Sequence, residues 1–258
     1  MDLGVTAIDT SFNYRGFTAH QTLGTYGRLL DRFHLSTKVG YFPAPTGPVH
    51  SLHPVMLRVT LEQVVRDLGR PPDLVFLHNP EATLSDDRDA ETTWANACDV
   101  LAAAVAAGLC GSWGVATWNP RPLLDLAGAA PPPHTLMVRA GLLVGARTLT
   151  AGETLAARWN LRPQQLWGMS PFGGSTTDPV WSAVDPRLLL PADGQALTLA
   201  QAAFRLAFEL PTVSCVAVGA QRPQHLADLL AALDHPVDPA VVRDYRALLD
   251  ARQQPTTV

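Results

Sequence analysis

Lysine is nearly absent from this sequence. Of the 19 basic residues all but one are arginine, and the single lysine is Lys38. A guanidinium stays protonated and is a wide planar fork, whereas an ammonium is a compact charge whose protonation responds to burial. A lone lysine in an arginine-rich chain therefore points to a chemical role, with chance retention as the alternative. Lys38 by itself does not decide between the two.

Cysteine is also scarce. The three cysteines, Cys98, Cys110 and Cys215, are far apart and show no CxxC or Cys/His spacing. This pattern excludes a disulfide scaffold and favours reduced thiols in a cytoplasmic protein. It also predicts no metal site.

Long hydrophobic runs and an excess of basic charge are missing as well. The longest apolar run covers residues 100–110, about half of the roughly 20 residues that cross a bilayer. The first 17 residues lack the apolar core of a signal peptide. A net charge of −4 argues against a nucleic-acid partner, and 47% hydrophobic residues indicate a globular protein. We expect a cytoplasmic protein without membrane or nucleic-acid partners; its oligomeric state stays open.

Short β-rich runs alternate with segments of helical period along all 258 residues. The strand candidates are 5–10, 33–40, 73–78, 111–117, 135–143, 165–172 and 213–220. The helix candidates are 54–69, 99–109, 120–128, 198–210, 222–234 and 241–252. Such alternation predicts a parallel sheet covered by helices, either open and doubly wound or closed into a barrel.

Polar residues at the strand ends favour the barrel. Asp9, Lys38, His78, Thr117 and Ser170 each stand at the C-terminal end of a different strand candidate. A (β/α)8 barrel builds its site from several strand ends, whereas an open sheet concentrates it near one switch point. No GxGxxG follows the first strand. We therefore predict a TIM-type (β/α)8 barrel, formed as a single domain over residues 1–258.

Three segments resemble the aldo-keto reductase superfamily. DTSFNYRGFTAHQTLG at 9–24 has the spacing of its signature, STKVG at 36–40 resembles the strand that ends in its lysine, and DLVFLHNPE at 73–81 resembles the strand that ends in its histidine. The resemblance implies a catalytic tetrad of Asp9, Tyr14, Lys38 and His78. In the family, a hairpin, a strand and a helix precede the segment that here starts at Met1, so we expect either a barrel that lacks its first βα unit or a start codon that was assigned too late.

The chemistry of these four residue types is consistent with that role. Hydride transfer to a carbonyl leaves negative charge on oxygen, which needs a proton donor. A phenol is a poor acid near pH 7, and a neighbouring ammonium favours loss of its proton. We expect Asp9 to hold Lys38 charged beside Tyr14, and His78 to hydrogen-bond the substrate oxygen. A guanidinium would displace Asp9 or Tyr14, which explains the lone lysine.

The resemblance also implies an NADP site made of three further segments: GSWGVATW at 111–118, MSPFGG at 169–174 and VAVGAQRPQHLADLL at 216–230. The implied cofactor-binding residues are Ala116, Thr117, Arg139, Met169, Ser170, Pro171, Gly219, Gln221 and Arg222. Where the family places Ser-Asn against the nicotinamide, this chain has Ala116-Thr117, and Met169 replaces a stacking aromatic residue. Leu229 stands where the family has an adenine-contacting asparagine. We expect NADP to bind more weakly than in the family generally.

Three functions remain in competition. The first is an NADP-dependent oxidoreductase acting on a small carbonyl or alcohol, with Tyr14 as general acid and base. The second is a redox-neutral dehydratase, isomerase or cyclase that reuses the tetrad, and the third is an inactive binding subunit. Arg15 and His20 replace the Gly and Glu of the signature and either contact a substrate or face solvent. Substrate specificity is expected from loops at 41–53, 144–153 and 173–190.

Overall fold

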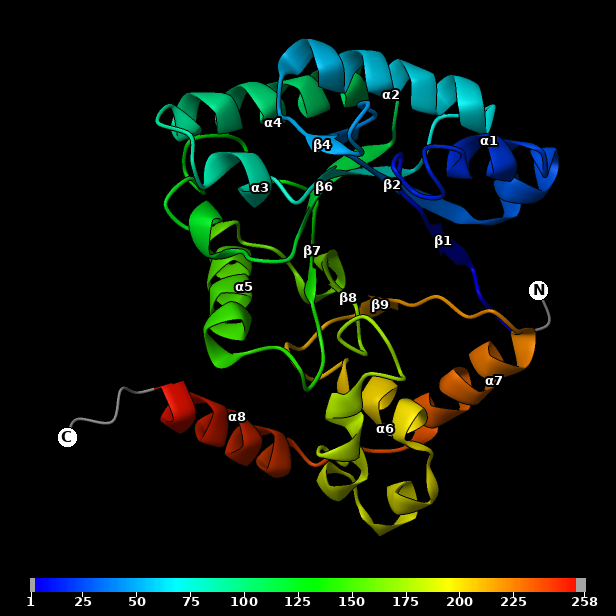
Figure 1. The fold of residues 1–258 in the computed structure, drawn as a ribbon, viewed down its shortest axis with the longest axis vertical. Coiled ribbons are helices and arrows are strands. Elements are labelled where there is room, and N and C mark those ends of the chain that lie inside the picture. The colour runs from blue at the N-terminus through cyan, green and yellow to red at the C-terminus, as the bar shows by residue number, and fades with distance from the viewer. Residues whose placement is uncertain (1–2, 254–258) are drawn as a thin grey trace. The chain divides into compact units, whose positions relative to one another are not determined.

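The computed structural model describes residues 3–253, shown in Figure 1. The chain divides into two compact units. The first unit comprises Met1–Met137 with Arg158–Leu161, and the second comprises Val138–Ala157 with Arg162–Val258. The single domain predicted from the sequence stays a prediction.

The first unit is built on parallel strands. Its strands are β1 Ala7–Asp9, β2 His34–Val39, β5 Leu74–His78 and β6 Ser112–Thr117, and β7 Thr135–Arg139 begins in it. β2 lies between β1 and β5, and β5 lies between β2 and β6. The register pairs Asp9 with Ser36, Lys38 with Phe76, and His78 with Ala116. These pairings bring the C-terminal ends of the four strands to one edge.

Burial explains why these runs form strands. Every residue of β5 is buried, and so is every residue of β2 after His34. Parallel strands that are covered on both faces have continuous runs of buried residues, whereas strands with one exposed face alternate buried and exposed residues. Helices cover them: α1 Ala19–Gly24, α2 Pro54–Leu68, α3 Glu81–Leu84 and α4 Ala90–Ala106. α2 runs beside α1 and α4 (Figure 1).

Local signals begin and end α2. Pro54 stands in its first turn, where the missing amide hydrogen costs nothing, and Gly69 ends it at φ 73°. Leu57, Leu61, Val64 and Leu68 form its buried face. Gly24, which closes the signature segment, is needed for close packing here, because a Cβ at this position would lie 2.2 Å from the carbonyl oxygen of Asp67.

A hairpin follows β2. Its strands are β3 Tyr41–Phe42 and β4 Val49–His50, paired antiparallel. The chain turns into it at Gly40, whose φ of 141° favours glycine. A Cβ at Gly40 would meet the His78 carbonyl oxygen at 3.0 Å and His50 Nε2 at 3.1 Å. Gly40 thus allows the hairpin to lie against the end of β5.

The second unit contains the remaining elements. They are the end of β7, most of α5 Ala146–Arg158, β8 Leu166–Met169, α6 Leu199–Leu206, β9 Cys215–Ala217, α7 Pro223–Ala231 and α8 Pro239–Gln253. β8 and β9 pair in parallel, with Met169 opposite Ala217. The core contains Leu142, Leu149, Trp181, Ala202, Leu206 and Leu210, and Tyr245 of α8 packs against it.

Some helices differ from the sequence predictions. α5 occupies much of 144–153, which was expected to be a loop; its buried face consists largely of Ala and Gly. α4 begins at Ala90, nine residues before the predicted start at 99. Segment 120–128 forms only a 3₁₀ turn at Arg121–Leu123 followed by turns, and prolines at 120 and 122 lack the amide hydrogens of a longer helix. No helix within residues 3–253 is long and apolar enough to span a membrane.

Candidate active site

The lone lysine lies inside the first unit and is paired with a carboxylate. Lys38 Nζ donates to Asp9 Oδ2, and also to the Thr10 carbonyl oxygen at 3.0 Å. Only 2% of the Lys38 side chain is exposed. Asp9 Oδ1 accepts a hydrogen bond from Ser36 Oγ at 2.7 Å. Because Ser36 and Lys38 are two residues apart on β2, they point to the same face of the sheet, and Asp9 binds both.

Tyr14 lies in the loop that follows β1. Its ring centroid is 5.3 Å from Lys38 Nζ and 6.4 Å from the ring centroid of His78. The loop is anchored to β2, since Phe12 N donates to the Lys38 carbonyl oxygen at 3.0 Å. Tyr14 is 42% exposed, so a molecule from solvent can reach its ring. Asp9, Tyr14, Lys38 and His78 are therefore brought together within one unit.

His78 ends β5 and is buried among polar groups. Its Nδ1 lies 3.1 Å from Ser11 Oγ, and its carbonyl oxygen accepts from His50 Nε2 at 2.8 Å. The Tyr41 ring packs edge-on against both imidazoles, at 5.0 Å from His78 and 4.8 Å from His50. The hairpin therefore holds the His78 ring and backbone in place.

The charge state of His78 follows from this environment. Burial lowers its pKa to about 3, and the positive charges of Lys38 and His50 act in the same direction. Burial also lowers the pKa of His50, although the hydrogen bond to the His78 carbonyl oxygen opposes this. His78 is therefore a neutral imidazole near pH 7.

Glu81 connects β5 to the end of β6. Its Oε1 accepts from the backbone N–H groups of Trp118 and Asn119, at 2.8 and 3.0 Å. Burial raises the pKa of Glu81, and the hydrogen bonds from the backbone N–H groups of Asn119 and Trp118 oppose that shift. Thr117, one of the predicted cofactor ligands, is fully buried, and its Oγ1 has no hydrogen-bond partner among the described residues. Ala116 is fully buried beside it.

The other predicted cofactor residues belong to the second unit. Arg139 ends β7, and Met169 ends β8 with 7% of its surface exposed. Ser170 follows Met169 in a left-handed conformation, with φ 55°, and leads into Pro171.

A further group of predicted residues precedes α7. Gly219, Gln221 and Arg222 are exposed, and Arg222 is the N-cap residue of the helix. A Cβ at Gly219 would contact nothing within 4 Å, so this backbone is open to approach. Leu229, in contrast, is buried on the inner face of α7.

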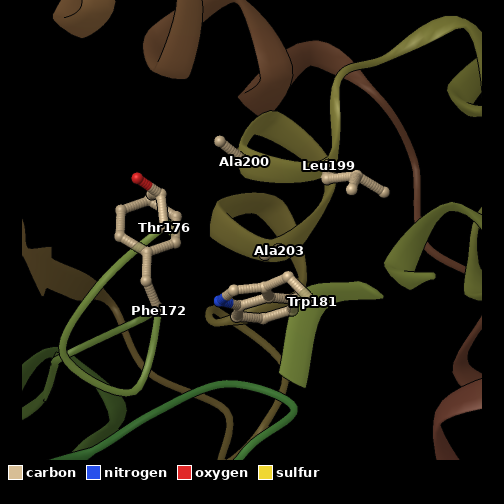
Figure 2. Close-up of a pocket in the computed structure, with 6 residues that line it drawn as sticks. All are labelled: Phe172, Thr176, Trp181, Leu199, Ala200 and Ala203. Carbon is tan, nitrogen blue, oxygen red and sulfur yellow. The ribbon is translucent and has the colours of Figure 1, made fainter. Parts of the chain in front are cut away.

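The second unit also forms a small apolar hollow, shown in Figure 2. Phe172 and Thr176 come from the loop after β8, and Trp181 lies beside α6, which supplies Leu199, Ala200 and Ala203. Trp181 Nε1 donates to the Ser175 carbonyl oxygen at 3.0 Å. Thr176 is the one polar side chain in this lining, too few to orient a ligand. We interpret the hollow as a packing gap between this loop and α6, and not as a binding site.

Sequence comparison identifies the family. A family model described as the aldo/keto reductase family matches residues 1–144, more than half of the chain. The chain belongs to the aldo/keto reductase family. No curated protein sequence matches it.

Solved structures agree with this membership. The aldo-keto reductase AKR11C1 of Bacillus halodurans, in its holo form, has a TM-score of 0.74 at 17% identity, covering 96% of this chain and 83% of that one. An aldo-keto reductase of Klebsiella pneumoniae in complex with NADPH has a TM-score of 0.68 at 20% identity, covering 100% and 83%. At these identities the likeness shows the fold. The (β/α)8-type fold predicted from the sequence is confirmed.

The two departures within the aldo/keto reductase signature have distinct structural explanations. His20 is 1% exposed and its Nε2 lies 2.6 Å from Thr37 Oγ1, so it neither faces solvent nor reaches a substrate. Burial lowers its pKa to about 4, and Asp67 opposes that shift. Arg15 is exposed and has φ 52°, a left-handed conformation that favours the glycine usual at this position in the family.

Several residues around the tetrad were not singled out from the sequence. Ser36 could have been found, because it precedes Lys38 by two residues on a strand. Ser11, Asn13 and Glu81 gave no such signal, since their partners lie on other strands or depend on the shape of a loop. Tyr41 and His50 depend on the hairpin folding back against β5.

Proposed function

We propose that this aldo/keto reductase family member is an NADP-dependent oxidoreductase that transfers a hydride between the nicotinamide and a carbonyl or alcohol substrate. The observation that carries the proposal is the group in the first unit: a buried ammonium held by a carboxylate, beside a partly exposed phenol and a neutral imidazole. Each of these groups has a task in exchanging a proton with a substrate oxygen.

Tyr14 is the proposed general acid and base. Its exposed ring is the member of the group that solvent-borne molecules reach most easily. Lys38, paired with Asp9, lies 5.3 Å from the Tyr14 ring centroid, where its positive charge stabilises the negative charge that develops on the phenolic oxygen during proton transfer. His78 offers the substrate an uncharged ring nitrogen, which orients it without neutralising Lys38.

The proposed cofactor is NADP, which supplies or accepts the hydride when bound. Gly219, Gln221 and Arg222 fit its phosphates, because an open backbone and an exposed guanidinium precede the N-terminus of α7. The Klebsiella pneumoniae relative was solved with NADPH, which supports the same nucleotide for this chain. Ala116, Thr117, Arg139, Met169, Ser170 and Pro171 are the proposed contacts of the nicotinamide half.

The side chains proposed to contact the nicotinamide offer fewer hydrogen bonds than the Ser-Asn pair that the family places there. Ala116 has no side-chain donor, and Thr117 offers a hydroxyl in place of an amide. A lost hydrogen bond costs about 0.5–1.5 kcal/mol and a lost aromatic contact costs about the same. Two or three such losses weaken binding by roughly 10²-fold, at about 1.4 kcal/mol per factor of ten. We therefore propose that this chain binds NADP more weakly than relatives that keep the Ser-Asn pair and the stacking aromatic residue.

The altered contacts to the nicotinamide also support a second candidate function. A tetrad beside a reduced nicotinamide pocket is suited to redox-neutral chemistry such as dehydration, isomerisation or cyclisation. The same Tyr14 and Lys38 would then move a proton without hydride transfer. The observation favouring it is Ala116 near the end of β6, whose side chain offers no hydrogen bond to the carboxamide of a nicotinamide.

One experiment separates the two. NADPH and NADH are titrated against tryptophan fluorescence of the full chain, and a panel of aldehydes and ketones is then added while NADPH oxidation is followed. The oxidoreductase predicts NADPH binding and carbonyl-dependent oxidation that Tyr14→Phe abolishes. Absence of binding by either nucleotide contradicts the oxidoreductase and favours the redox-neutral enzyme.

A further inference from the structure

Glu81 is a buried acidic residue that takes no part in the proposed proton transfer. Only 8% of its surface is exposed, and it begins the short helix α3 just after β5. Its Oε1 accepts hydrogen bonds from the backbone N–H groups of Trp118 and Asn119, at 2.8 and 3.0 Å. Its Oε2 is buried and has no hydrogen-bond partner among the described residues. Burying a carboxylate with one oxygen unpaired costs stability, and a neutral acceptor would bind the same N–H groups at a lower cost.

The two N–H groups lie where the ladder between β5 and β6 ends. Its last backbone contact is the hydrogen bond from Asn79 N to the Ala116 carbonyl oxygen, at 2.7 Å. In a regular parallel ladder the Trp118 N–H would next bind the Asn79 carbonyl oxygen. That oxygen instead accepts from Ala82 N at 2.9 Å, because the chain turns into α3 at Asn79, which has φ 50°. The Glu81 carboxylate therefore takes the place of the missing backbone acceptor.

This end of β6 carries residues proposed to contact the nicotinamide. Ala116 and Thr117 directly precede Trp118, so the direction of the backbone at Trp118 decides where their groups lie. Ala116 offers no side-chain hydrogen bond, and Thr117 Oγ1 is buried without a partner among the described residues. Binding here therefore depends on where the backbone places these groups. A segment that is ordered before binding also loses less entropy when the ligand arrives.

We propose that Glu81 is a positioning residue whose carboxylate fixes the backbone after β6, so that the nicotinamide half of NADP binds to an already ordered segment. This role needs an acceptor oxygen and not a negative charge. Glu81→Gln should therefore preserve it, and Glu81→Ala should abolish it. The part that concerns the nicotinamide rests on the proposed function, whereas the fixing of the backbone does not.

Amide hydrogen exchange tests whether Glu81 fixes the backbone. In the ¹⁵N-labelled full chain, we expect Glu81→Ala to speed exchange of the Trp118 and Asn119 amides by about tenfold or more, the effect of losing a hydrogen bond to a charged acceptor. Glu81→Gln should keep both amides protected. If Glu81→Ala does not fold, Glu81→Met replaces it, because it fills similar space without an acceptor oxygen. Unchanged exchange in the variant without an acceptor overturns the proposal.

Asp73→Ala is the matched control. The Asp73 carboxylate also binds a strand N–H group, since its Oδ2 accepts from Leu35 N at 2.7 Å. Asp73 directly precedes β5, whereas Glu81 follows it, so the two carboxylates hold opposite ends of the strands. We expect Asp73→Ala to lower the free energy of unfolding in urea and to leave both the exchange of the Trp118 and Asn119 amides and the binding of NADPH unchanged.

Nucleotide binding tests what the ordered backbone does. NADPH is compared with adenosine 2′,5′-bisphosphate, which keeps the phosphate half of the cofactor and has no nicotinamide. Tryptophan fluorescence titration measures both dissociation constants. We expect Glu81→Ala to raise the Kd of NADPH about tenfold and to leave that of the bisphosphate unchanged. Glu81→Gln should bind both ligands as the unaltered protein does.

The outcomes distinguish this proposal from the proposed function. If the unaltered protein does not bind NADPH, the oxidoreductase and the role of Glu81 toward the nicotinamide are both rejected, and the exchange rates decide its role toward the backbone. If NADPH binds but Glu81→Ala weakens both ligands equally, or neither, the positioning role is overturned and the oxidoreductase stands. Equal losses in Glu81→Gln and Glu81→Ala show that the charge is required and overturn the assignment to an acceptor oxygen.

Discussion

Lys38 and Asp9 form an ion pair in which the ammonium is almost completely enclosed. The Lys38 side chain is 2% exposed and that of Asp9 is 20% exposed. An enclosed charge is tolerated only when it is paired and hydrogen-bonded, and the Thr10 carbonyl oxygen and Ser36 hydroxyl complete this arrangement. The space that remains suits a compact ammonium.

Lys38→Arg tests this fit. The guanidinium keeps the positive charge but is wider, so it displaces Asp9 or Tyr14. We expect kcat to fall by about 10²-fold, as a displacement near 1 Å in an active site does. Steady-state NADPH oxidation measures it, with the exposed Arg28→Lys as the matched control. Full activity of Lys38→Arg would show that charge alone is required at this position.

Tyr14→Phe tests the proton donor. The substitution removes the hydroxyl and keeps the ring beside Lys38 and His78. We expect turnover to fall by about 10² to 10⁴, the usual cost of losing a general acid, with cofactor affinity nearly unchanged. Tyr26→Phe is the control, since Tyr26 is 58% exposed and lies in another turn. Retained turnover in Tyr14→Phe would assign proton transfer to a different group.

Two buried histidines predict a loss of stability in mild acid. The pKa is about 4 for His20 and about 3 for His78, below the ordinary 6.5, so the unfolded chain binds more protons below pH 6.5. The stability contributed by each neutral ring is complete above pH 6.5. It is lost as pH falls toward the folded-state values, by up to about 1.4 kcal/mol per pH unit and ring.

Urea unfolding at pH 7, 6 and 5 measures this dependence. His20→Gln should flatten the slope of unfolding free energy against pH. His53→Gln, at an exposed position without a side-chain cap bond, should leave it unchanged. An identical slope in His20→Gln and the unaltered protein would show that His20 does not titrate between the two states.

Arg15→Gly should stabilise the protein. A left-handed conformation costs a residue with a Cβ roughly 1–2 kcal/mol, and glycine avoids this at an entropic cost of about 0.5–1 kcal/mol. With φ 52° at Arg15, we expect a net gain of about 0.5–1 kcal/mol in the free energy of unfolding. The neighbouring Gly16→Ala, at φ 62°, should lower it. Equal stability in all three proteins would mean that this turn relaxes freely.

Arg222→Ala tests the nucleotide preference. If Arg222 binds a 2′-phosphate, its removal weakens NADPH binding and leaves NADH binding unchanged. Because the side chain is exposed, we expect the effect to be at the lower end of a charge-assisted hydrogen bond, about tenfold in Kd. Fluorescence titration measures both nucleotides, with the exposed Arg243→Ala as control. Equal weakening of both would contradict a 2′-phosphate contact.

The sequence by itself determined the fold class and the four residues of the proposed tetrad. Buried parallel strands leave continuous apolar runs, and five of the seven strand candidates had a polar residue at the C-terminal end, several of them in an order and spacing that resemble a known family. These signals are local, because a strand end, a turn tyrosine and a lone lysine can all be read within a few residues.

Only the tertiary structure decided how those residues are held. The contact between Ser11 and His78 joins positions 67 residues apart, and the one between Glu81 and Trp118 joins positions 37 apart. No local pattern reports such pairs, since they form when strands far apart in sequence lie side by side. α5 was missed although its apolar residues recur at helical spacing, because most of its buried face is Ala and Gly, which add little hydrophobic bulk. Close packing, as at Gly152 against Val138, shows that this face is buried.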